Sequence, residues 1–383
     1  MGNTERTYQK VNDIQLNKSG QVLFESIAQL VDQARKFVGR TADITMCVVY
    51  FEIGRMIMEE EQGGQARAKY GKGLIIELST FLNERYKKGF SETNLKNARK
   101  FYQVYSGSIR QTLSAELKND ESLALSKALN AESPFKLGWS MYQVLMRIKN
   151  DDERNFYEIE AFKQQWTVEQ LKRQYHSSLY ERLALSMNKD ELMRLAKEGH
   201  NMDAPKDMLK NPLVLEFLNL EENSSYSESD LESAIISKLS QFLLELGKGF
   251  LYEARQKRFT FDEQHFFVDL VFYNRLLDCY VIIDLKTKEL KHQDLGQMQM
   301  YVNYFDRHVK TDKENPTVGI LLCKEKSDNI VELTLPADAN IYASEYSLYL
   351  PDKALLQRKL AEWVEEFENM QTQTDILEKE MDS

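Results

Sequence analysis

Three charged side chains lie within or directly after two apolar runs between Phe266 and Lys286, a stretch with the sequence FFVDLVFYNRLLDCYVIIDLK. They are Asp269, Asp284 and Lys286. Two carboxylates and an ammonium group are costly to bury among aliphatic and aromatic residues unless they bind something or pair with each other. This stretch is therefore the main candidate for a site of chemistry.

The same stretch predicts an antiparallel hairpin. Its two apolar runs are rich in β-branched and aromatic residues, and the polar Asn274, Arg275 and Asp278 lie between them. This pattern is typical of two strands joined by a short turn. Side chains alternate along a strand, so Asp284 and Lys286 must lie on one face.

The spacing of these charges resembles the PD-(D/E)XK nuclease signature in its D…DxK form. The flanking segments LESAIISKLSQFLLELGKGF and GQMQMYVNY strengthen the likeness. More closely, the chain resembles the YhcG-type family of bacterial PD-(D/E)XK nucleases, from about Ala34 to Leu183 and from Asp230 to Leu350. The resemblance implies an all-α, winged-helix-like N-terminal domain, followed by an α/β PD-(D/E)XK core of a helix, three strands, a helix and a strand.

A metal-dependent reaction suits these residues. Hard oxygen ligands favour Mg²⁺ or Mn²⁺, and we expect Asp269, Asp284 and the Leu285 carbonyl to hold the ion. Lys286 would position the attacking water or offset negative charge on the phosphate. The alternative is an internal ion pair of an aspartate with Lys286 in an inactive fold. Buried pairs contribute little to stability, so that alternative gives no reason for these charges.

Three more residues acquire a role from the resemblance. Glu232 would help to hold the metal, because the family pattern has a glutamate on the first helix. From the sequence alone, a capping box that begins at Ser229 is the better explanation of Glu232. Gln297, on a helix expected to cross the active-site cleft, and Arg255, on the expected strand FLYEARQKRFTF, would contact the DNA backbone. Without the resemblance, Gln297 would be a surface residue, and a solvated strand edge explains Arg255 as well as a phosphate contact does.

The distribution of charge allows DNA binding despite a net charge of −10. Charge acts locally, over a Debye length of about 8–10 Å. Between Gly64 and Arg110, ten Lys or Arg residues accompany three Glu residues, a local charge of +7. The N-terminal part of the chain is therefore the expected DNA-binding part.

That basic segment predicts a helix-turn-helix. One helix is expected from about Tyr70, Gly89 allows a sharp turn, and Ser91 is a suitable N-cap for a second helix. The alternative is a solvated polar face on an ordinary helical hairpin, and the family resemblance favours DNA contact. The residues expected to meet DNA are Lys87, Lys88, Asn94, Lys96, Arg99 and Lys100.

The composition suggests a cytoplasmic protein of more than one domain. The chain has 383 residues and no apolar run near the ~18 residues of a membrane span, and its polar start does not resemble a signal peptide. Cys47, Cys279 and Cys323 are far apart, which predicts core residues and not a zinc site or disulfides. We expect a disordered segment over 1–20, a helical DNA- or partner-binding domain over 21–186 with an insertion or wing over 106–135, a linker with a short helix over 187–229, the nuclease domain over 230–350, and an acidic amphipathic helix over 351–383.

Together these features predict a Mg²⁺-dependent DNA endonuclease in phage defence, restriction or DNA recombination or repair. The alternative is a non-catalytic DNA-binding or regulatory subunit of a restriction-type complex. The acidic tail carries an apolar stripe that must be covered, and two active sites suit the cutting of both DNA strands, so we expect a homo-oligomer. The stripe consists of Leu356, Leu360, Trp363, Phe367 and Met370.

Overall fold

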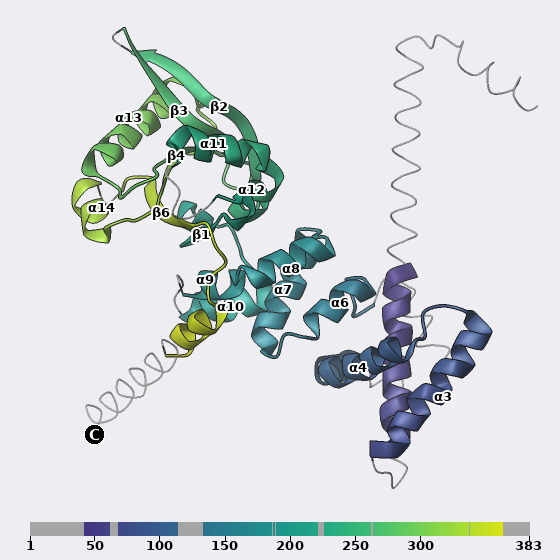
Figure 1. Cartoon of the computed structure of the whole chain (residues 1–383). Coiled ribbons are helices and arrows are strands. Elements are labelled where there is room, and N and C mark those ends of the chain that lie inside the picture. The colour runs from purple at the N-terminus through teal and green to yellow at the C-terminus, as the bar shows by residue number, and fades with distance from the viewer. Residues whose placement is uncertain are drawn as a thin grey trace, which may run out of the picture. The chain divides into compact units, whose positions relative to one another are not determined.

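The computed structural model describes residues 42–61, 68–113, 133–185, 187, 189–220, 226–261, 263–336 and 338–362. The chain forms two compact units, Met1–Lys149 and Asn150–Ser383, whose elements are labelled in Figure 1. Within the described ranges, no helix combines the length and the apolar character needed to cross a membrane.

All secondary structure in the described part of the first unit is helical. Residues 42–61 are helical, followed by α3 (Ala68–Tyr86), α4 (Glu92–Leu113) and α6 (Trp139–Leu145). Its core is aromatic, with five rings of the described residues centred within 5.8 Å of the Phe101 ring. The expected wing lies mostly outside the described residues, because α4 continues to Leu113 and 114–132 are not described. The winged-helix character therefore stays a prediction.

The helix-turn-helix layout expected from the sequence is present between α3 and α4. Gly89 has φ +100°, a conformation that L-residues with a side chain rarely adopt. The Tyr50 hydroxyl donates to the Gly89 carbonyl at 3.0 Å. At the start of α4, Oγ of Ser91 accepts a hydrogen bond from the Asn94 N–H at 3.3 Å, as expected of an N-cap. Local turn chemistry thus fixes where the second helix begins.

The second unit opens with four helices: α7 (Asp151–Lys163), α8 (Val168–His176), α9 (Leu179–Ala184) and α10 (Lys189–Glu198). Asn150 caps α7 by accepting from the Glu153 N–H, and Thr167 forms a capping box with Gln170 on α8. Two short 3₁₀ helices, Pro205–Met208 and Glu216–Leu218, follow α10.

A six-stranded mixed sheet in the order β1-β6-β5-β4-β3-β2 forms the centre of this unit. Strands β2 to β4 are antiparallel neighbours, and β4, β5, β6 and β1 are parallel. The α/β order expected from the sequence is confirmed by β2, β3, β4, α13 (His292–His308) and β5, and two further strands, β6 and β1, extend the sheet beyond β5. The strands are β1 (Leu213–Val214), β2 (Phe250–Phe261), β3 (Gln264–Asn274), β4 (Cys279–Leu285), β5 (Val318–Cys323) and β6 (Ile341–Ser347).

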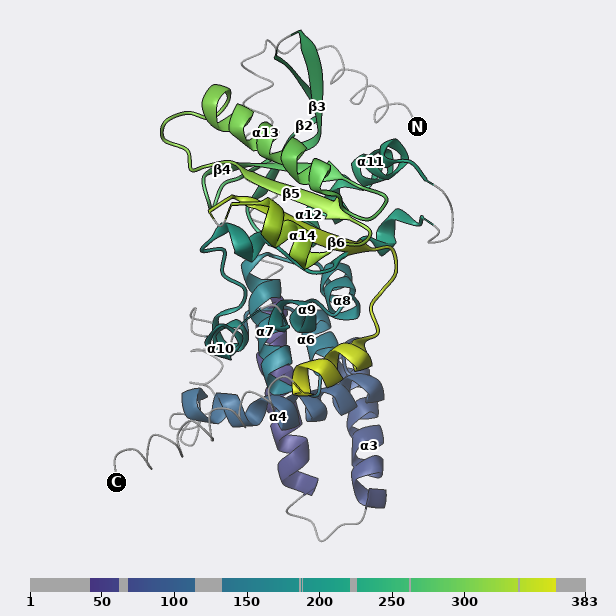
Figure 2. The same cartoon turned by 90° about the vertical axis from the view of Figure 1, so that its left-hand side faces the viewer.

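Helices cover both faces of the sheet. Helices α11 (Glu228–Ser237) and α12 (Leu239–Leu246) pack on one face, against a core that includes Leu270 and Ile283. Helix α13 (His292–His308) packs on the opposite face, seen in front of the strands in Figure 2, and α14 (Asp328–Thr334) lies beside it. Strand β4 is therefore buried on both sides, which explains its nearly continuous apolar run.

The boundary between the two units lies earlier than the expected linker over 187–229. Part of that segment is β1, which pairs with β6, and Leu213 of β1 and the adjacent Leu215 are buried in the core. Upstream, the Arg182 guanidinium on α9 forms an ion pair with the Glu245 carboxylate on α12 at 2.6 Å, and both side chains are fully buried. These contacts join α7–α10 to the sheet, so the compact unit begins at Asn150.

The start of the C-terminal tail is helical over 353–362. Nζ of Lys353 lies 2.6 Å from Glu153 and 2.7 Å from Glu181, over the ring of Tyr175. Gln357 also donates to Glu181. The first turn of the expected tail helix therefore packs on α7 and α9 of its own chain, while Trp363, Phe367 and Met370 fall outside the described residues.

Candidate active site

The strand register brings the two aspartates of the hairpin together. Strands β3 and β4 pair antiparallel, with Leu270 opposite Ile283 at the last pair. One step further along this register, Asp269 lies opposite Asp284, and opposite residues of an antiparallel pair have neighbouring side chains. The expected hairpin is confirmed, and its open end carries both carboxyl groups.

Asp284 is buried, with only 4 % of its surface exposed. Burial and the neighbouring charge of Asp269 raise the pKa of Asp284 to about 7, against the opposing attraction of Lys286. Nζ of Lys286 lies 2.7 Å from Oδ2 of Asp284. Even so, this oxygen accepts no hydrogen bond of favourable geometry from any residue that the structure describes. It therefore retains the capacity to bind a further positive group.

Asp269 is anchored at both carboxylate oxygens. Oδ2 accepts a hydrogen bond from the Leu285 N–H at 2.8 Å, and Oδ1 accepts one from Nε2 of Gln256 at 2.9 Å. Leu285 lies beyond the last β3–β4 pair, and the N–H and C=O groups of a strand residue point to the same side. The Leu285 carbonyl thus lies on the side of Asp269, where β3 no longer pairs with β4.

Lys286 is held at the end of β4 by its backbone and its side chain. Its N–H donates to the Leu322 carbonyl of β5 at 2.7 Å, and its Nζ lies 3.9 Å from Glu228 in addition to the closer Asp284. Burial alone would lower the pKa of Lys286, but the attraction of the nearby Asp284 carboxylate outweighs burial and raises that pKa. The ammonium group therefore stays charged at neutral pH.

Glu232 is not part of a capping box. The capping box of α11 is formed by Ser227 and Asp230, so the helix begins two residues earlier than expected and Glu232 lies in its interior. Glu232 is buried, and its two oxygens accept hydrogen bonds from Arg255 and Gln256 of β2. Both oxygens of Glu232 are thus held by protein donors.

Arg255 has a different role from the one expected. Its Nε donates to Glu232, and its Nη2 donates to Oγ of Ser233 at 3.0 Å. The guanidinium group therefore ties the edge strand β2 to α11. This engagement does not support the expected contact of Arg255 with a phosphate.

Gln256 is a member of the site that the sequence did not reveal. Its Nε2 lies 2.7 Å from Oε2 of Glu232 and 2.9 Å from Oδ1 of Asp269. In the sequence, Gln256 is one polar residue of an edge strand in which polar residues are common, and no motif marks it. The signal that identifies it is structural: its contacts and its backbone conformation.

Helix α13 borders the site, as the resemblance implied. Gln297 donates a hydrogen bond to the Tyr301 hydroxyl one turn along the helix. Burial raises the pKa of Tyr301, and the negative charge of Asp284 adds to this increase. The Gln297 amide is therefore attached to a buried tyrosine on the same face as Asp284.

The donor atoms at the strand ends fit a divalent cation. Two aspartate carboxyl groups and the Leu285 carbonyl are hard oxygen ligands, and Oδ2 of Asp284 still lacks a hydrogen bond. In the described part of the chain, no group of three His, Cys, Asp or Glu side chains is arranged to hold a metal, and Glu232 is engaged by Arg255 and Gln256. Mg²⁺ usually keeps several waters and needs few protein carboxylates, so two aspartates are a sufficient set.

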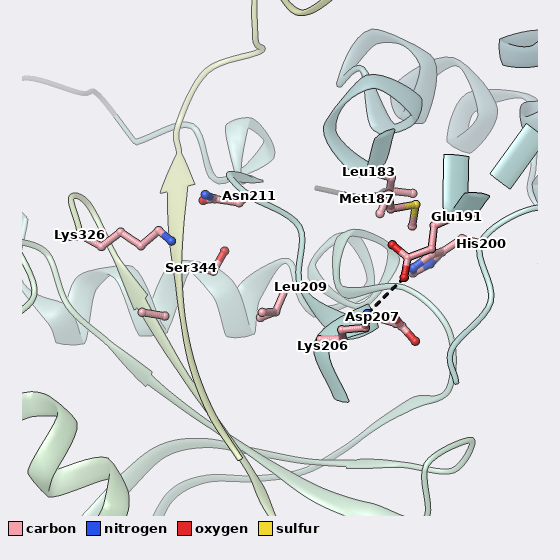
Figure 3. Close-up of a pocket in the computed structure, with 11 residues that line it drawn as sticks. Leu183, Met187, Glu191, His200, Lys206, Asp207, Leu209, Asn211, Lys326 and Ser344 are labelled. Atoms are coloured by element: carbon pink, nitrogen blue, oxygen red, sulfur yellow. Dashed lines mark hydrogen bonds and ion pairs between the residues drawn. The ribbon is translucent and has the colours of Figure 1, made fainter. Parts of the chain in front are cut away.

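A cavity of about 280 Å³ lies elsewhere in the second unit (Figure 3). Its lining includes His200, Asn211, Lys326 and Ser344, and Lys206 pairs there with Glu191 at 3.2 Å. None of the hairpin aspartates, Lys286 or Glu232 lines it. The candidate active site is thus an open strand end and not an enclosed cavity, which suits a large polymeric substrate.

The expected DNA-contacting residues of the first unit fall into two groups. Lys87, Lys88 and Lys100 are exposed, whereas Lys96 pairs with Glu92 and Arg99 pairs with Glu61. Asn94 makes hydrogen bonds within its own unit, and its contact with DNA stays a prediction. Its side chain donates to the Gly89 carbonyl and accepts from Gln143, because it lies at the base of the turn.

Solved structures with distant likeness include a repair endonuclease from Pyrococcus abyssi, with 17% identity and a TM-score of 0.24 over 34% of this chain and 50% of that one. A structure of an EndoMS–dsDNA2 complex gives 14% identity and a TM-score of 0.24 over 35% of this chain and 50% of that one. The chain spans about half the length of these proteins.

Family comparisons cover most of the chain. Residues 26–182 match the DUF1016 N-terminal domain, and residues 206–361 match the YhcG PDDEXK nuclease domain. A protein of Escherichia coli (strain K12) named "Putative nuclease YhcG" is 40% identical over 354 residues, which is 89% of this chain and 93% of that protein. The chain therefore belongs to the YhcG family, with a DUF1016 N-terminal domain and a PDDEXK nuclease domain.

Proposed function

We propose that this protein is a metal-dependent DNA endonuclease that hydrolyses phosphodiester bonds. The observation that carries the proposal is the group formed by Asp269, Asp284 and Lys286, called here the carboxylate–lysine group. Its members meet at the end of a strand that is otherwise apolar and buried. Apolar residues of similar size would often stabilise such a position equally well, so packing does not account for these charges.

The proposed ion ligands are Asp269, Asp284 and the Leu285 carbonyl. A bound Mg²⁺ or Mn²⁺ would supply a more acidic water and positive charge beside the phosphate. The pKa of about 7 means that Asp284 is partly protonated near neutral pH in the metal-free protein. Ion binding requires the carboxylate form, so metal affinity should increase as the pH rises through this value.

Lys286 supplies a fixed positive charge of the chain's own. Its side chain is 15% exposed and its Nζ is held at 2.7 Å from Asp284, so it is oriented before substrate arrives. One divalent ion balances the two aspartates and leaves the ammonium group as surplus positive charge. We infer that Lys286 orients the attacking water or stabilises charge on the phosphate.

The helix-turn-helix is the proposed DNA-binding element of the first unit. Lys87 and Lys88 in the turn and Lys100 on α4 are exposed, and side chains of this kind contact phosphates and position a protein on DNA. We further propose that the protein acts as a homo-oligomer in the cytoplasm, in defence, restriction or DNA recombination or repair. Partner proteins of a restriction-type complex would join it through the helical unit.

A cleavage assay on supercoiled and linear DNA tests the proposal. The full chain should nick or cut DNA with Mg²⁺ or Mn²⁺, and EDTA should abolish this activity. The Asp278→Asn variant is a matched control, because it removes a carboxylate from the exposed β3–β4 turn. DNA binding without cleavage, whichever ion is supplied, would instead favour the non-catalytic subunit.

A further inference from the structure

One amide group connects two carboxylates that come from different elements. Nε2 of Gln256, on β2, lies 2.7 Å from Glu232 of α11 and 2.9 Å from Asp269 of β3. An amide nitrogen carries two hydrogens, so it can donate one hydrogen bond to each carboxylate. The bridge holds the Glu232 and Asp269 carboxyl groups close together.

The backbone at Gln256 is specialised for this bridge. Its φ is +47°, which is uncommon for a residue with a long side chain, and particularly so within a strand. The change of conformation reverses the alternation of side chains, so that the adjacent Arg255 and Gln256 both reach Glu232. Without it, one of the two would point to the opposite face of the sheet.

The alternation of side chains along β3 is also interrupted at this position. Leu270 packs in the core beneath α11 and α12, whereas Val268, two residues away, packs in the core beneath α13. Asp269 lies between them and opposite Gln256 in the β2–β3 register. Beyond this point β2 and β3 continue as a two-stranded ribbon (Figure 1), because β4 pairs with β3 only from Leu270 onward. Irregularities of this kind often occur beside active sites, where they redirect a side chain.

We propose that Gln256 is a positioning residue that holds Glu232 and Asp269 in place for the reaction at the strand ends. The inference rests on the proposed nuclease function and adds a residue to it. Gln256 fixes one Asp269 oxygen while the Leu285 N–H fixes the other, so the carboxylate has one orientation before an ion binds. In the same way, Arg255 fixes one oxygen of Glu232 by donating a hydrogen bond to it.

Two substitutions separate the bridge from the backbone. Gln256→Ala removes the amide and keeps a side chain at positive φ, whereas Gln256→Gly removes the amide and also relieves the strain. If the side chain is what matters, both variants should bind Mn²⁺ about 10- to 100-fold more weakly than wild type, as is common for residues that orient metal ligands. Titration calorimetry with Mn²⁺ alone measures this without any cleavage.

Gln256→Glu tests the donor itself. It has the same shape but places a third carboxylate between two others, so DNA cleavage at saturating Mn²⁺ should fall with little change in KM for DNA. Gln256→His, which can still offer an N–H, should recover part of the Mn²⁺ affinity.

Glu263 supplies the matched control, because it also has positive φ, +63°, but lies in the exposed turn of the same ribbon. Glu263→Gly and Glu263→Ala should leave Mn²⁺ binding unchanged. Wild-type affinity in Gln256→Ala, or a loss in Gln256→Ala that Gln256→Gly restores, would overturn the positioning role. Wild type that binds Mn²⁺ but cuts no DNA would overturn the nuclease function separately, since the calorimetric comparison would still stand.

Discussion

The two units of this protein hold their charged residues in opposite ways. On the helix-turn-helix of the first unit, Lys96 and Arg99 form ion pairs at the surface, and Lys87, Lys88 and Lys100 are exposed. Solvated side chains of this kind cost little to maintain, and their pairs contribute little to stability. Their presence therefore says little about function unless DNA binding is measured.

The second unit buries charges at a cost. Asp284 is surrounded by the apolar side chains of β4 and carries a strongly raised pKa, and Arg182 and Glu245 are both fully buried. Asp284 lacks a good hydrogen bond at Oδ2, whereas Arg182 and Glu245 have several partners. The satisfied pair holds α9 to α12, and the carboxyl group without a hydrogen bond is the one that we propose for the reaction.

The largest effect on stability is expected at the satisfied pair. Arg182→Met leaves Glu245 buried without its closest cation, and breaking such a pair costs about 3–5 kcal/mol. The melting temperature of the full chain should fall by roughly 10 °C. Arg194→Met removes an exposed pair with Glu198 and should change little. Equal melting temperatures for both variants would contradict the assignment of α9 to the second compact unit.

The pH dependence of this pair has a definite sign. Burial disfavours the Glu245 carboxylate, but Arg182, Lys210 and Arg173 outweigh burial and lower the pKa of Glu245 to about 2. This value lies below that of an unfolded glutamate, so the stabilisation is complete above about pH 4.5 and is lost as the pH falls toward 2.

Asp284→Asn should have the opposite effect on stability. The pKa of Asp284 is raised to about 7 in the folded chain, so the folded state loses stability as the pH rises from about 4 to 7. At pH 8 in EDTA the variant should be more stable than wild type by roughly 2–4 kcal/mol, and the gain should vanish near pH 4. Thermal unfolding across this range provides the measurement. A variant that is less stable at pH 8 would contradict the burial of an unsatisfied charge.

A smaller effect is expected on DNA affinity. Reversing the charge at Lys87, Lys88 and Lys100 should weaken binding and reduce the slope of log K against log salt by roughly 0.9 for each lost phosphate contact. Reversing the charge at Lys96 and Arg99, which already form ion pairs, should reduce the slope less. Lys149→Glu is the control, since Lys149 is exposed outside the helix-turn-helix. An unchanged slope in the first variant would exclude this element from DNA binding.

The smallest predicted change concerns self-association. Truncation after Leu350 removes the tail helix, whose first turn is held by Lys353 on Glu153 and Glu181. Light scattering should give a dimer for the full chain and a smaller species for the truncated one. Two monomers at micromolar concentration would mean that the tail packs entirely within its own chain.

Much of the fold could be predicted because its signals are local. The strand FLYEARQKRFTF has the same bounds as β2, and the two apolar runs around the Asn274 turn became β3 and β4. In the same way, Gly89 and Ser91 mark the turn and the cap of α4. Each of these depends on residues within a few positions of one another.

The features that could not be predicted depend on distant partners. The capping box at Ser227 frees Glu232 to meet Arg255 and Gln256, more than twenty residues later. The position of the Gln256 side chain depends on the positive φ of this residue, which no residue pattern predicts. The early boundary at Asn150 likewise follows from pairs such as Arg182 with Glu245, which a sequence does not display.

The most direct test of the central claim is a comparison of cleavage and binding in Asp284→Ala and Lys286→Ala. With Mg²⁺, both variants should lose cleavage of plasmid DNA by roughly a hundredfold or more, while their DNA affinity in Ca²⁺ or EDTA stays close to that of wild type. This result would assign the carboxylate–lysine group to the cleaved phosphate. Full cleavage activity in both variants would contradict the account.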